Sequence, residues 1–239
     1  MLRYFKGFAL AWNMLTIIPL FKVHDFFKGI NGISAMFYPF VGFFLGGILY
    51  GVYTGLNAVF PPVHAAVAMF VLWVVLTGAL HLDGFSDTVD GLFVSKEKAF
   101  IVMKDSHVGG MGMLFSVVFL IFKVSSVVYL GEYVFLPLIL ALSRFNAVMA
   151  IYTFPYISSG ISQLVKEEMN LKLLLVAFGF VFLVALYMGV LWLLAVSLLF
   201  CFVVSKLFVR RYCGLNGDMY GFLIETTELF LLNILIAVL

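Results

Sequence analysis

Residues 81–112 read HLDGFSDTVDGLFVSKEKAFIVMKDSHVGGMG and separate two long apolar runs. The segment holds four aspartates, Asp83, Asp87, Asp90 and Asp105, in a chain that has only 12 acidic residues among 239. The apolar runs on either side are each about twenty residues long, which is the length that a helix needs to cross a bilayer. Carboxylates this dense between two membrane-crossing segments predict a metal or phosphate site at a membrane surface.

The composition of the chain indicates an integral membrane protein. Hydrophobic residues make up 64% of the sequence, charged residues make up 11%, and the mean hydropathy is +1.17. About a quarter of the residues of a soluble domain are charged. The apolar runs have helical length and lack the alternation of a membrane barrel, so we predict an all-α, polytopic integral membrane helical bundle. The net charge of +2 argues against a nucleic-acid partner, and two cysteines are too few for a disulfide framework.

We predict a single integral membrane domain over residues 1–239. The stretch Gly7–Phe21 is short for a span and contains Asn13 and Pro19, so we expect an interfacial or re-entrant helix there, with no cleavage site after it. About seven transmembrane helices follow, and Pro39 is expected to kink the first of them. Their predicted positions are Ile33–Leu56, Val63–Leu82, Met111–Leu130, Val134–Phe154, two helices within Leu171–Val209 that divide near Tyr187–Gly189, and Gly221–Leu239.

The basic residues predict the orientation of these helices. If the loops alternate sides and the N-terminal helix does not cross, all but two of the 14 Lys and Arg residues fall on one side. The two exceptions, Lys123 and Arg144, lie inside predicted spans. Positive charge collects on the cytoplasmic side of a membrane, so we expect the aspartate segment and the loops 155–170 and 210–220 to face the cytoplasm, with the C-terminus outside. The residues on that side are Arg3, Lys6, Lys22, Lys28, Lys96, Lys98, Lys104, Lys166, Lys172, Lys206, Arg210 and Arg211.

The spacing of the first three aspartates predicts a metal site. Asp83, Asp87 and Asp90 are spaced i, i+4, i+7, so on a helix they lie within an arc of roughly 60°. Three carboxylates on one stripe repel each other unless a cation or protons intervene, and oxygen ligands favour Mg²⁺ or Mn²⁺. The alternative is a solvated loop whose acids cap helices. Such a loop does not need to place its acids on one face and Gly84 and Gly91 on a neighbouring one.

The residues that follow suggest a phosphate site. Lys104 could neutralise a phosphate, and the glycines at 109, 110 and 112 would expose backbone N–H groups, which favour anions at a helix start. His81 and His107 are candidates for substrate contacts, although interfacial histidines would look the same.

A second polar group of residues lies at the start of the last predicted span. Asp218 and Glu225 share a helical face there, and Glu228 follows. Carboxylates at this depth are costly unless they face a cavity or a partner, so we expect one site assembled from the two segments. The mid-span Arg144 should pair with one of these acids or with a ligand phosphate, and Lys123 is expected to pair structurally or to snorkel.

Four segments resemble the cobalamin synthase family. His81–Gly91, HLDGFSDTVDG, resembles the HLDGxxDxxDG motif of that family, and Met103–Gly109, MKDSHVG, resembles its MKDSRxG segment. The C-terminal GDxxG at residues 217–221 with Glu225, and LTIIP at residues 15–19, are similar to two further family segments. The chain departs from the usual pattern at Ile17 and His107, where the family has arginine, and at Asn216, where it more often has threonine.

The resemblance implies the fold and activity of that family. Its members are adenosylcobinamide-GDP ribazoletransferases, which join the activated corrinoid to α-ribazole or its 5′-phosphate, release GMP and require Mg²⁺. The resemblance also implies a bacterial or archaeal cytoplasmic (inner) membrane with the active site facing the cytoplasm. The expected partners are the small-molecule substrates, membrane lipid and a second copy of the chain.

We assign candidate roles on these grounds. The predicted metal ligands are Asp83, Asp87, Asp90 and Asp105. Asp83, Asp87 and Asp90 are also the predicted catalytic residues, with Asp90 as a further ligand or as the base that takes the hydroxyl proton. The predicted substrate-binding residues are His81, Lys104, Ser106, His107, Arg144, Asn216, Asp218 and Glu225.

Two other functions fit parts of the pattern. A CDP-alcohol phosphotransferase-like phospholipid synthase would share the metal and the nucleotide leaving group, but its D-G-x-x-A-R run is missing, because Phe85-Ser86-Asp87 follows Asp83-Gly84. A cation transporter or channel would place its acids near the membrane midplane. Eleven of the 12 acids map at or near the cytoplasmic side, and only Glu132 does not, which favours an enzyme.

Overall fold

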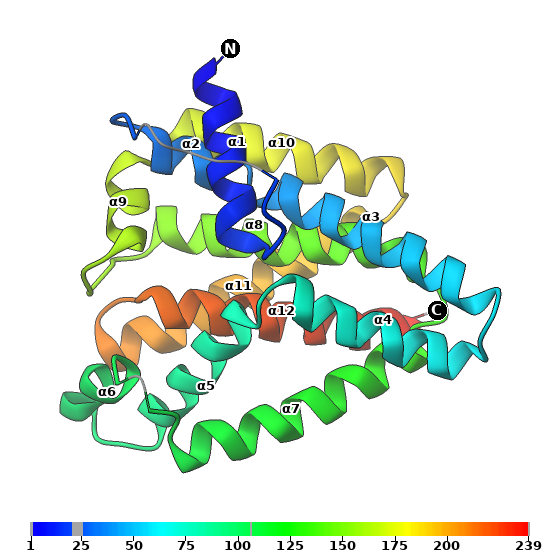
Figure 1. Cartoon of the computed structure of the whole chain (residues 1–239). Helices are drawn as coiled ribbons and strands as arrows, with labels where there is room; N and C mark the ends of the chain where they lie inside the picture. The colour runs from blue at the N-terminus through cyan, green and yellow to red at the C-terminus, as the bar shows by residue number, and fades with distance from the viewer. Residues whose placement is uncertain (1, 21–25, 106, 239) are drawn as a thin grey trace.

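The protein is a bundle of α-helices. The computed structural model describes residues 2–20, 26–105 and 107–238, and within these ranges the chain forms helices and no strand. Figure 1 shows the helices in chain order. Their bounds are α1 (Leu2–Leu15), α2 (Ile30–Met36), α3 (Tyr38–Asn57), α4 (Pro62–Leu76), α5 (Leu80–Leu92), α6 (Lys96–Met103), α7 (Gly110–Tyr129), the 3₁₀ turn η1 (Tyr133–Phe135), α8 (Leu136–Thr153), α9 (Ile161–Glu168), α10 (Leu171–Tyr187), α11 (Leu191–Tyr212) and α12 (Gly217–Val238).

The helices confirm a multi-pass membrane protein. Five segments of the described chain are long and apolar enough to cross a bilayer: α3, α7, η1 with α8, α11 and α12. Two further pairs pass the same test together but are sharply bent, α4–α5 by 80° and α9–α10 by 97°. By length and composition, five segments of the described chain can cross a membrane, or seven if each bent pair is one span, and the predicted seven is the upper end of that range.

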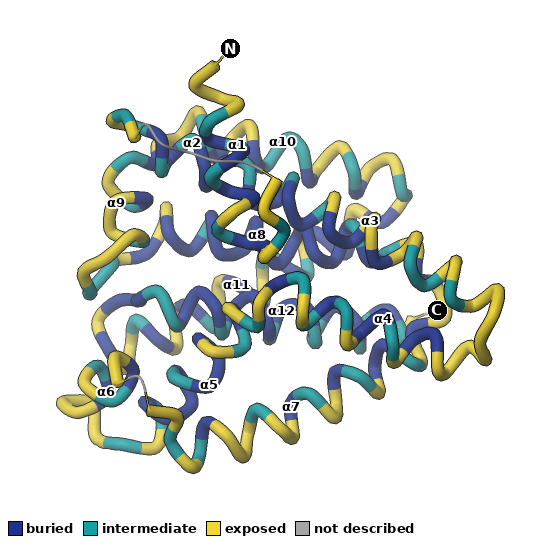
Figure 2. Tube along the Cα trace, viewed as in Figure 1, coloured by how far each residue is buried: buried dark blue, intermediate teal, exposed yellow. Residues whose placement is uncertain are grey.

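Helix α8 forms the centre of the bundle. It is buried along most of its length (Figure 2), and α3, α10, α11 and α12 all pack against it. The contact with α3 is closest at Gly42 and Gly46, where an added Cβ would collide with the α8 backbone. Small residues let membrane helices approach this closely, because packing rather than hydrophobicity holds them together in lipid.

The predicted span Val63–Leu82 is wrong at its end. The helix stops at Leu76, and Gly78 and Ala79 then adopt left-handed φ values of 60° and 53°. The Thr77 hydroxyl donates to the carbonyl oxygens of the last turn, which competes with helix continuation. As a result the aspartates are not an extension of the span: they lie on α5, a separate helix that begins after the bend.

The first predicted span is also divided. Helix α2 ends at Met36 and α3 begins at Tyr38, so the break precedes Pro39, which takes a first-turn position where its missing N–H costs nothing. Helix α1 begins earlier than predicted and ends at Leu15; Phe21 lies outside the described residues. It crosses the long helices steeply (Figure 1) and is not among the candidate spans. Its position at the membrane surface stays a prediction.

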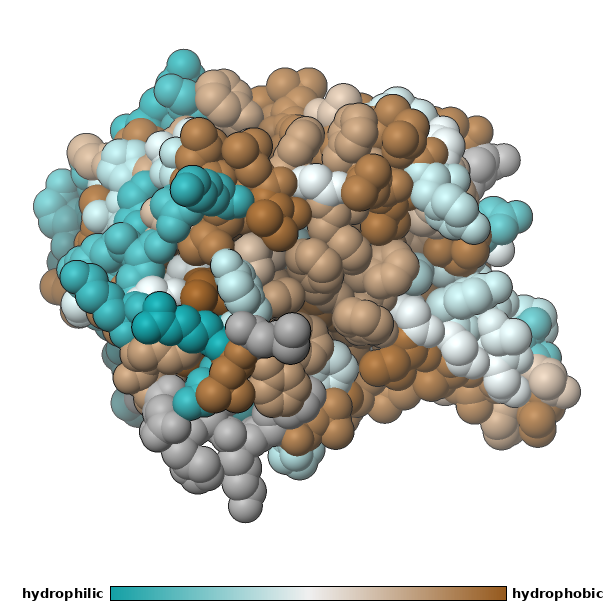
Figure 3. All heavy atoms as spheres, turned by 90° about the horizontal axis from the view of Figure 1, so that it is seen from above, coloured by the Kyte–Doolittle hydropathy of each residue, from teal (hydrophilic) through white to brown (hydrophobic). Residues whose placement is uncertain are grey.

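Polar segments from distant parts of the chain meet at one end of the bundle. Arg211 of α11 donates to the carbonyl oxygens of Leu92 and Val94 at 2.9 and 3.3 Å. The Leu215 N–H donates to the Pro155 carbonyl at 2.9 Å, which ties the 155–170 loop to the start of α12. Hydrophilic residues gather at this end, and apolar ones cover the middle of the molecule (Figure 3). The three segments predicted to share one side therefore do so.

Candidate active site at the polar end of the bundle

Two glycines bring α5 and α12 into backbone contact. A Cβ on Gly84 would lie 2.9 Å from the Asp218 carbonyl oxygen and 3.3 Å from the Cα of Gly221, and a Cβ on Gly221 would lie 3.0 Å from the His81 carbonyl oxygen. Side chains on both helices would hold them apart. Because both positions are glycine, the aspartates of α5 lie beside the first turn of α12. The two polar segments singled out in the sequence thus form one site.

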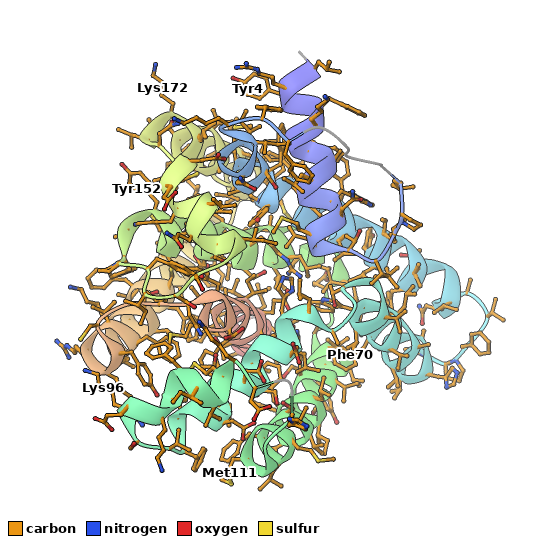
Figure 4. The ribbon with its side chains drawn as sticks, turned by 60° about the vertical axis from the view of Figure 1, so that its left-hand side comes forward. Tyr4, Phe70, Lys96, Met111, Tyr152 and Lys172 are labelled. Atoms are coloured by element: carbon orange, nitrogen blue, oxygen red, sulfur yellow. The ribbon has the colours of Figure 1, made fainter. Side chains whose placement is uncertain are left out.

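The α5 aspartates run from the surface into the protein. Asp83 is exposed, Asp87 is half-buried and Asp90 is buried. The acidic groups whose charges act on Asp87 are Asp83, Asp218 and Asp90, and Lys104 is close enough for its charge to act on Asp218. Figure 4 turns this end toward the viewer, with Lys96 and Lys172 at its rim. The aspartates of the site outnumber the basic side chains that act on them. This excess of negative charge favours a bound cation.

The same residues do not form a complete metal centre by themselves. Within the described ranges, no group of three His, Cys, Asp or Glu side chains is arranged to hold an ion. Mg²⁺ commonly binds through one or two carboxylates and takes its remaining ligands from water and substrate phosphates. The carboxylates of Asp83 and Asp87 fit that use, because they act on each other's charge and are at least partly accessible, and the charge of Asp218 acts on Asp87 from the neighbouring helix.

Asp90 points away from this group, toward the start of α7. Its Oδ2 accepts the Gly109 N–H at 2.9 Å and its Oδ1 accepts the Gly112 N–H at 2.8 Å. The glycine-rich helix start predicted to bind an anion therefore holds a carboxylate of the protein itself. A Cβ at either glycine would collide with Asp90. This geometry favours a positioning role for Asp90, joining α5 to α7, over the predicted roles of metal ligand and base.

Asn216 fixes the orientation of Asp218. The buried Asn216 caps α12 by accepting the Met219 N–H at 3.0 Å, and its Nδ2 donates to Asp218 Oδ2 at 2.8 Å. This bond holds the Asp218 carboxylate in one orientation at the start of α12. Asn216 thus acts on the site through Asp218, and its contact with substrate stays a prediction.

The loop after α6 lies at the surface. Asp105 accepts hydrogen bonds from the Nδ1 and backbone N–H of His107, at 2.7 and 3.1 Å, and both side chains are exposed. These bonds hold the pKa of Asp105 below its usual value. In this arrangement the Asp105 carboxylate faces His107 rather than the α5 acids. Ser106 lies outside the described residues, and Lys104 is the loop residue that interacts with Asp218.

Arg144 and Glu225 belong to a buried ion cluster, which also contains Lys123 and Glu228. Lys123 Nζ donates to Glu225 Oε2 at 2.6 Å and to Glu228, and Arg144 donates to Glu228. The cluster is balanced in charge, and all four side chains are almost fully buried. Lys123 therefore has the structural pairing predicted for it. For Arg144 the sequence left two partners open, an acid or a ligand phosphate, and the partner in the structure is the acid Glu228. Glu225 faces Lys123 rather than the α5 aspartates.

A cavity of about 250 Å³ lies beside the carboxylates. Asp83, Gly84 and His81 of α5 line it together with Asp218 and Tyr220 of α12, and α1, α8 and α9 supply apolar walls. His81 is buried and lines this cavity, and its contact with substrate stays a prediction. Tyr220 was missed in the sequence, where a tyrosine near a span end looks like an interfacial aromatic.

Comparison with known proteins identifies the family. The family model described as cobalamin-5-phosphate synthase matches residues 7–236, nearly the whole chain. The chain belongs to the cobalamin-5-phosphate synthase family. This confirms the resemblance found in the HLDGFSDTVDG and MKDSHVG segments. No solved structure matches the chain.

Relatives of this synthase family extend over most of the chain. A protein of Brevibacillus brevis is 34% identical over 213 residues, which cover 85% of this chain and 87% of that protein. One of Desulfitobacterium hafniense is 33% identical over 244 residues, covering 93% of each. One of Thermosynechococcus vestitus is 36% identical over 211 residues, covering 83% and 84%. All three are named adenosylcobinamide-GDP ribazoletransferase.

Replacing Gly84 by alanine should destabilise this synthase. The added methyl would meet the Asp218 carbonyl at 2.9 Å, so α5 and α12 must separate, at an expected cost of about 1–3 kcal/mol. Gly51 of α3 is the matched control, because nothing lies within 4 Å of its Cβ position and alanine is the better helix former. Thermal unfolding in detergent measures both variants. Equal midpoints for the two would contradict the close contact.

Proposed function

We propose that this chain is an adenosylcobinamide-GDP ribazoletransferase that requires Mg²⁺. The observation that carries the proposal is the family match over residues 7–236, and the carboxylates at the α5–α12 crossing supply suitable chemistry. In the reaction, a ribose hydroxyl of α-ribazole or its 5′-phosphate attacks the corrinoid-side phosphorus of adenosylcobinamide-GDP. An O–P bond forms, the P–O bond to the bridging oxygen breaks, and GMP leaves.

Asp83 and Asp87 would hold the metal. Bound Mg²⁺ supplies charge neutralisation to the pyrophosphate oxygens and helps to align them for in-line displacement. Asp83 and Asp218 come from different helices and line the same cavity, so a pyrophosphate held through a metal at Asp83 would lie next to a nucleophile bound beside Asp218. Asn216 keeps one oxygen of Asp218 engaged, which fixes the direction of the other.

Lys104 would neutralise charge on a phosphate oxygen, and Asp218 would accept the proton of the attacking hydroxyl. Lys104 is exposed at the end of α6 and acts on the charge of Asp218, so it can reach a phosphate oxygen from the solvent side. Asp218 faces the cavity and is placed to accept the proton of the attacking hydroxyl. We assign this step to Asp218 rather than to Asp90, because both oxygens of Asp90 accept backbone N–H groups.

The membrane and the orientation are part of the proposal. Lys96, Lys104, Lys166 and Arg211 all lie on segments of the polar end, and such charge favours the cytoplasmic side of a bacterial or archaeal inner membrane. Cys213 is exposed at this end. A membrane-impermeant thiol reagent should label it in inverted vesicles and not in intact cells. Association of two copies stays a prediction.

Release of GMP by the detergent-purified protein tests the function. Adenosylcobinamide-GDP with α-ribazole should give GMP in Mg²⁺, and omission of either substrate or addition of EDTA should abolish release. Excess Mg²⁺ added after EDTA should restore it, which separates metal removal from unfolding. A folded protein that releases no GMP would overturn the proposal. Metal-dependent CMP release from CDP-activated alcohols, or cation flux in liposomes, would then support the two alternatives.

A further inference from the structure

The cavity beside the carboxylates has a polar side and an apolar side. Asp83, Asp218 and His81 line it from the α5–α12 crossing, whereas Met14, Ile151 and Val165 line it from α1, α8 and α9. We propose that the apolar side binds the aromatic base of the nucleoside substrate, the benzimidazole of α-ribazole, with Tyr220 and His81 selecting it. This inference rests on the proposed function and adds a location and a specificity device for one of its two substrates.

The size of the cavity suits one part of a substrate. Its volume is about 250 Å³, below the range of about 300–1,000 Å³ that is typical of pockets for drug-sized ligands. A corrin macrocycle is far larger than such a ligand, so the corrinoid must lie outside the cavity. A flat bicyclic base has the shape and polarity of the inner part, where Leu15, Tyr38 and Ile224 add further apolar surface.

Two residues of the cavity wall each have a buried polar atom with no hydrogen-bond partner among the described residues. His81 and Tyr220 are each 5% exposed, both line the cavity, and neither His81 Nδ1 nor the Tyr220 hydroxyl forms a hydrogen bond with any described residue. A buried polar group without a partner is unfavourable, so both atoms favour a ligand that carries hydrogen-bonding groups among apolar ones. A benzimidazole nucleoside has one free ring nitrogen, which can accept from the tyrosine hydroxyl, and ribose hydroxyls.

The position of the cavity determines how a bound nucleoside is oriented toward the carboxylates. Asp83 and Asp218 line the same space as the apolar residues, so a base held on the apolar side leaves the attached ribose next to the carboxylates. The ribose hydroxyl then lies where the pyrophosphate would be held and where Asp218 can take its proton. The activated corrinoid would approach from the exposed side, on which Asp83 and Lys104 lie.

The variant Tyr220→Phe tests the proposal. It removes one unpaired hydroxyl, so the thermal midpoint should not fall, while KM for α-ribazole should rise about tenfold with KM for adenosylcobinamide-GDP unchanged. The control is Tyr133→Phe. The Tyr133 hydroxyl donates to the Val127 carbonyl at 2.8 Å. Val127 lies near the end of α7, whereas the start of that helix is the part that contacts Asp90. This variant should therefore lower the midpoint and leave both KM values unchanged. A rise in KM for the corrinoid substrate alone, or no rise in either, would overturn the assignment.

Inhibition by base fragments supplies a second test on the unaltered protein. Free 5,6-dimethylbenzimidazole should compete with α-ribazole and should not compete with adenosylcobinamide-GDP. Guanine should not compete with α-ribazole. The reverse pattern would assign the cavity to the nucleotide of the activated corrinoid and overturn the proposal. Failure of the proposed function would look different. The wild-type protein would then release no GMP from adenosylcobinamide-GDP, whether α-ribazole or its 5′-phosphate is added.

Discussion

Asp83→Asn should lower kcat about 10²- to 10³-fold, because loss of one metal carboxylate costs several kcal/mol of transition-state stabilisation and each 1.4 kcal/mol is tenfold in rate. Asp83 is exposed on the first turn of α5 and accepts no side-chain hydrogen bond within the described protein, so the fold should tolerate the change. GMP release at saturating and at limiting Mg²⁺ measures the effect. The Mg²⁺ concentration for half-maximal rate should also rise.

Two further substitutions serve as controls for Asp83→Asn. Glu97→Gln removes an exposed carboxylate of α6 outside the site and should leave turnover unchanged. Asp105→Asn should have a smaller effect than Asp83→Asn, because the Asp105 carboxylate faces His107. Wild-type turnover of Asp83→Asn at limiting Mg²⁺ would contradict the metal assignment.

Glu228→Gln should destabilise the bundle by about 3–5 kcal/mol, the usual cost of breaking a buried ion pair from one side. Glu228 is fully buried and is the partner of both Arg144 and Lys123. Its neutralisation would leave two cations to share Glu225 in the interior of the membrane bundle. Thermal unfolding in detergent should show the loss as a large fall in the midpoint.

A matched double variant separates stability from catalysis. Arg144→Met together with Glu228→Met removes one positive and one negative charge, so it should recover much of the midpoint lost in Glu228→Gln. If the cluster is structural, the recovered protein should also recover GMP release. A stable double variant without activity would instead support the substrate-binding role that the sequence suggested for Arg144.

The sequence predicts the class of fold and the residues of the site better than their arrangement. Apolar runs of bilayer length specify a membrane bundle, and the i, i+4, i+7 spacing of acids specifies a helix, because both depend on local pattern. The bend before α5 could not be predicted in this way, since Ala79 adopts a left-handed φ that alanine ordinarily avoids and only tertiary packing sustains.

Contacts between distant segments account for the remaining differences. Whether Asp90 meets a metal or the N–H groups of Gly109 and Gly112 depends on where α7 begins in space. The cavity likewise needs α1 and α9, which have no site motif beyond the resemblance at residues 15–19 and reach the carboxylates only through the folded chain. Arg144 had two possible partners in the sequence, and the depth of Glu228 on α12 determined which one it has.

The contact between Asp90 and Gly109 spans 19 positions of the chain. This bond holds the end of α5 against the start of α7, so the chain that contains α6 leaves and re-enters the bundle at the same place. Substitutions at its exposed positions 96–98 should therefore leave the spacing of Asp83 and Asp87 unaltered, whereas changes at Met103 or Lys104 would reach the site itself. The solvent-facing rim of the site can therefore change at positions 96–98 while Asp83 and Asp87 keep their geometry.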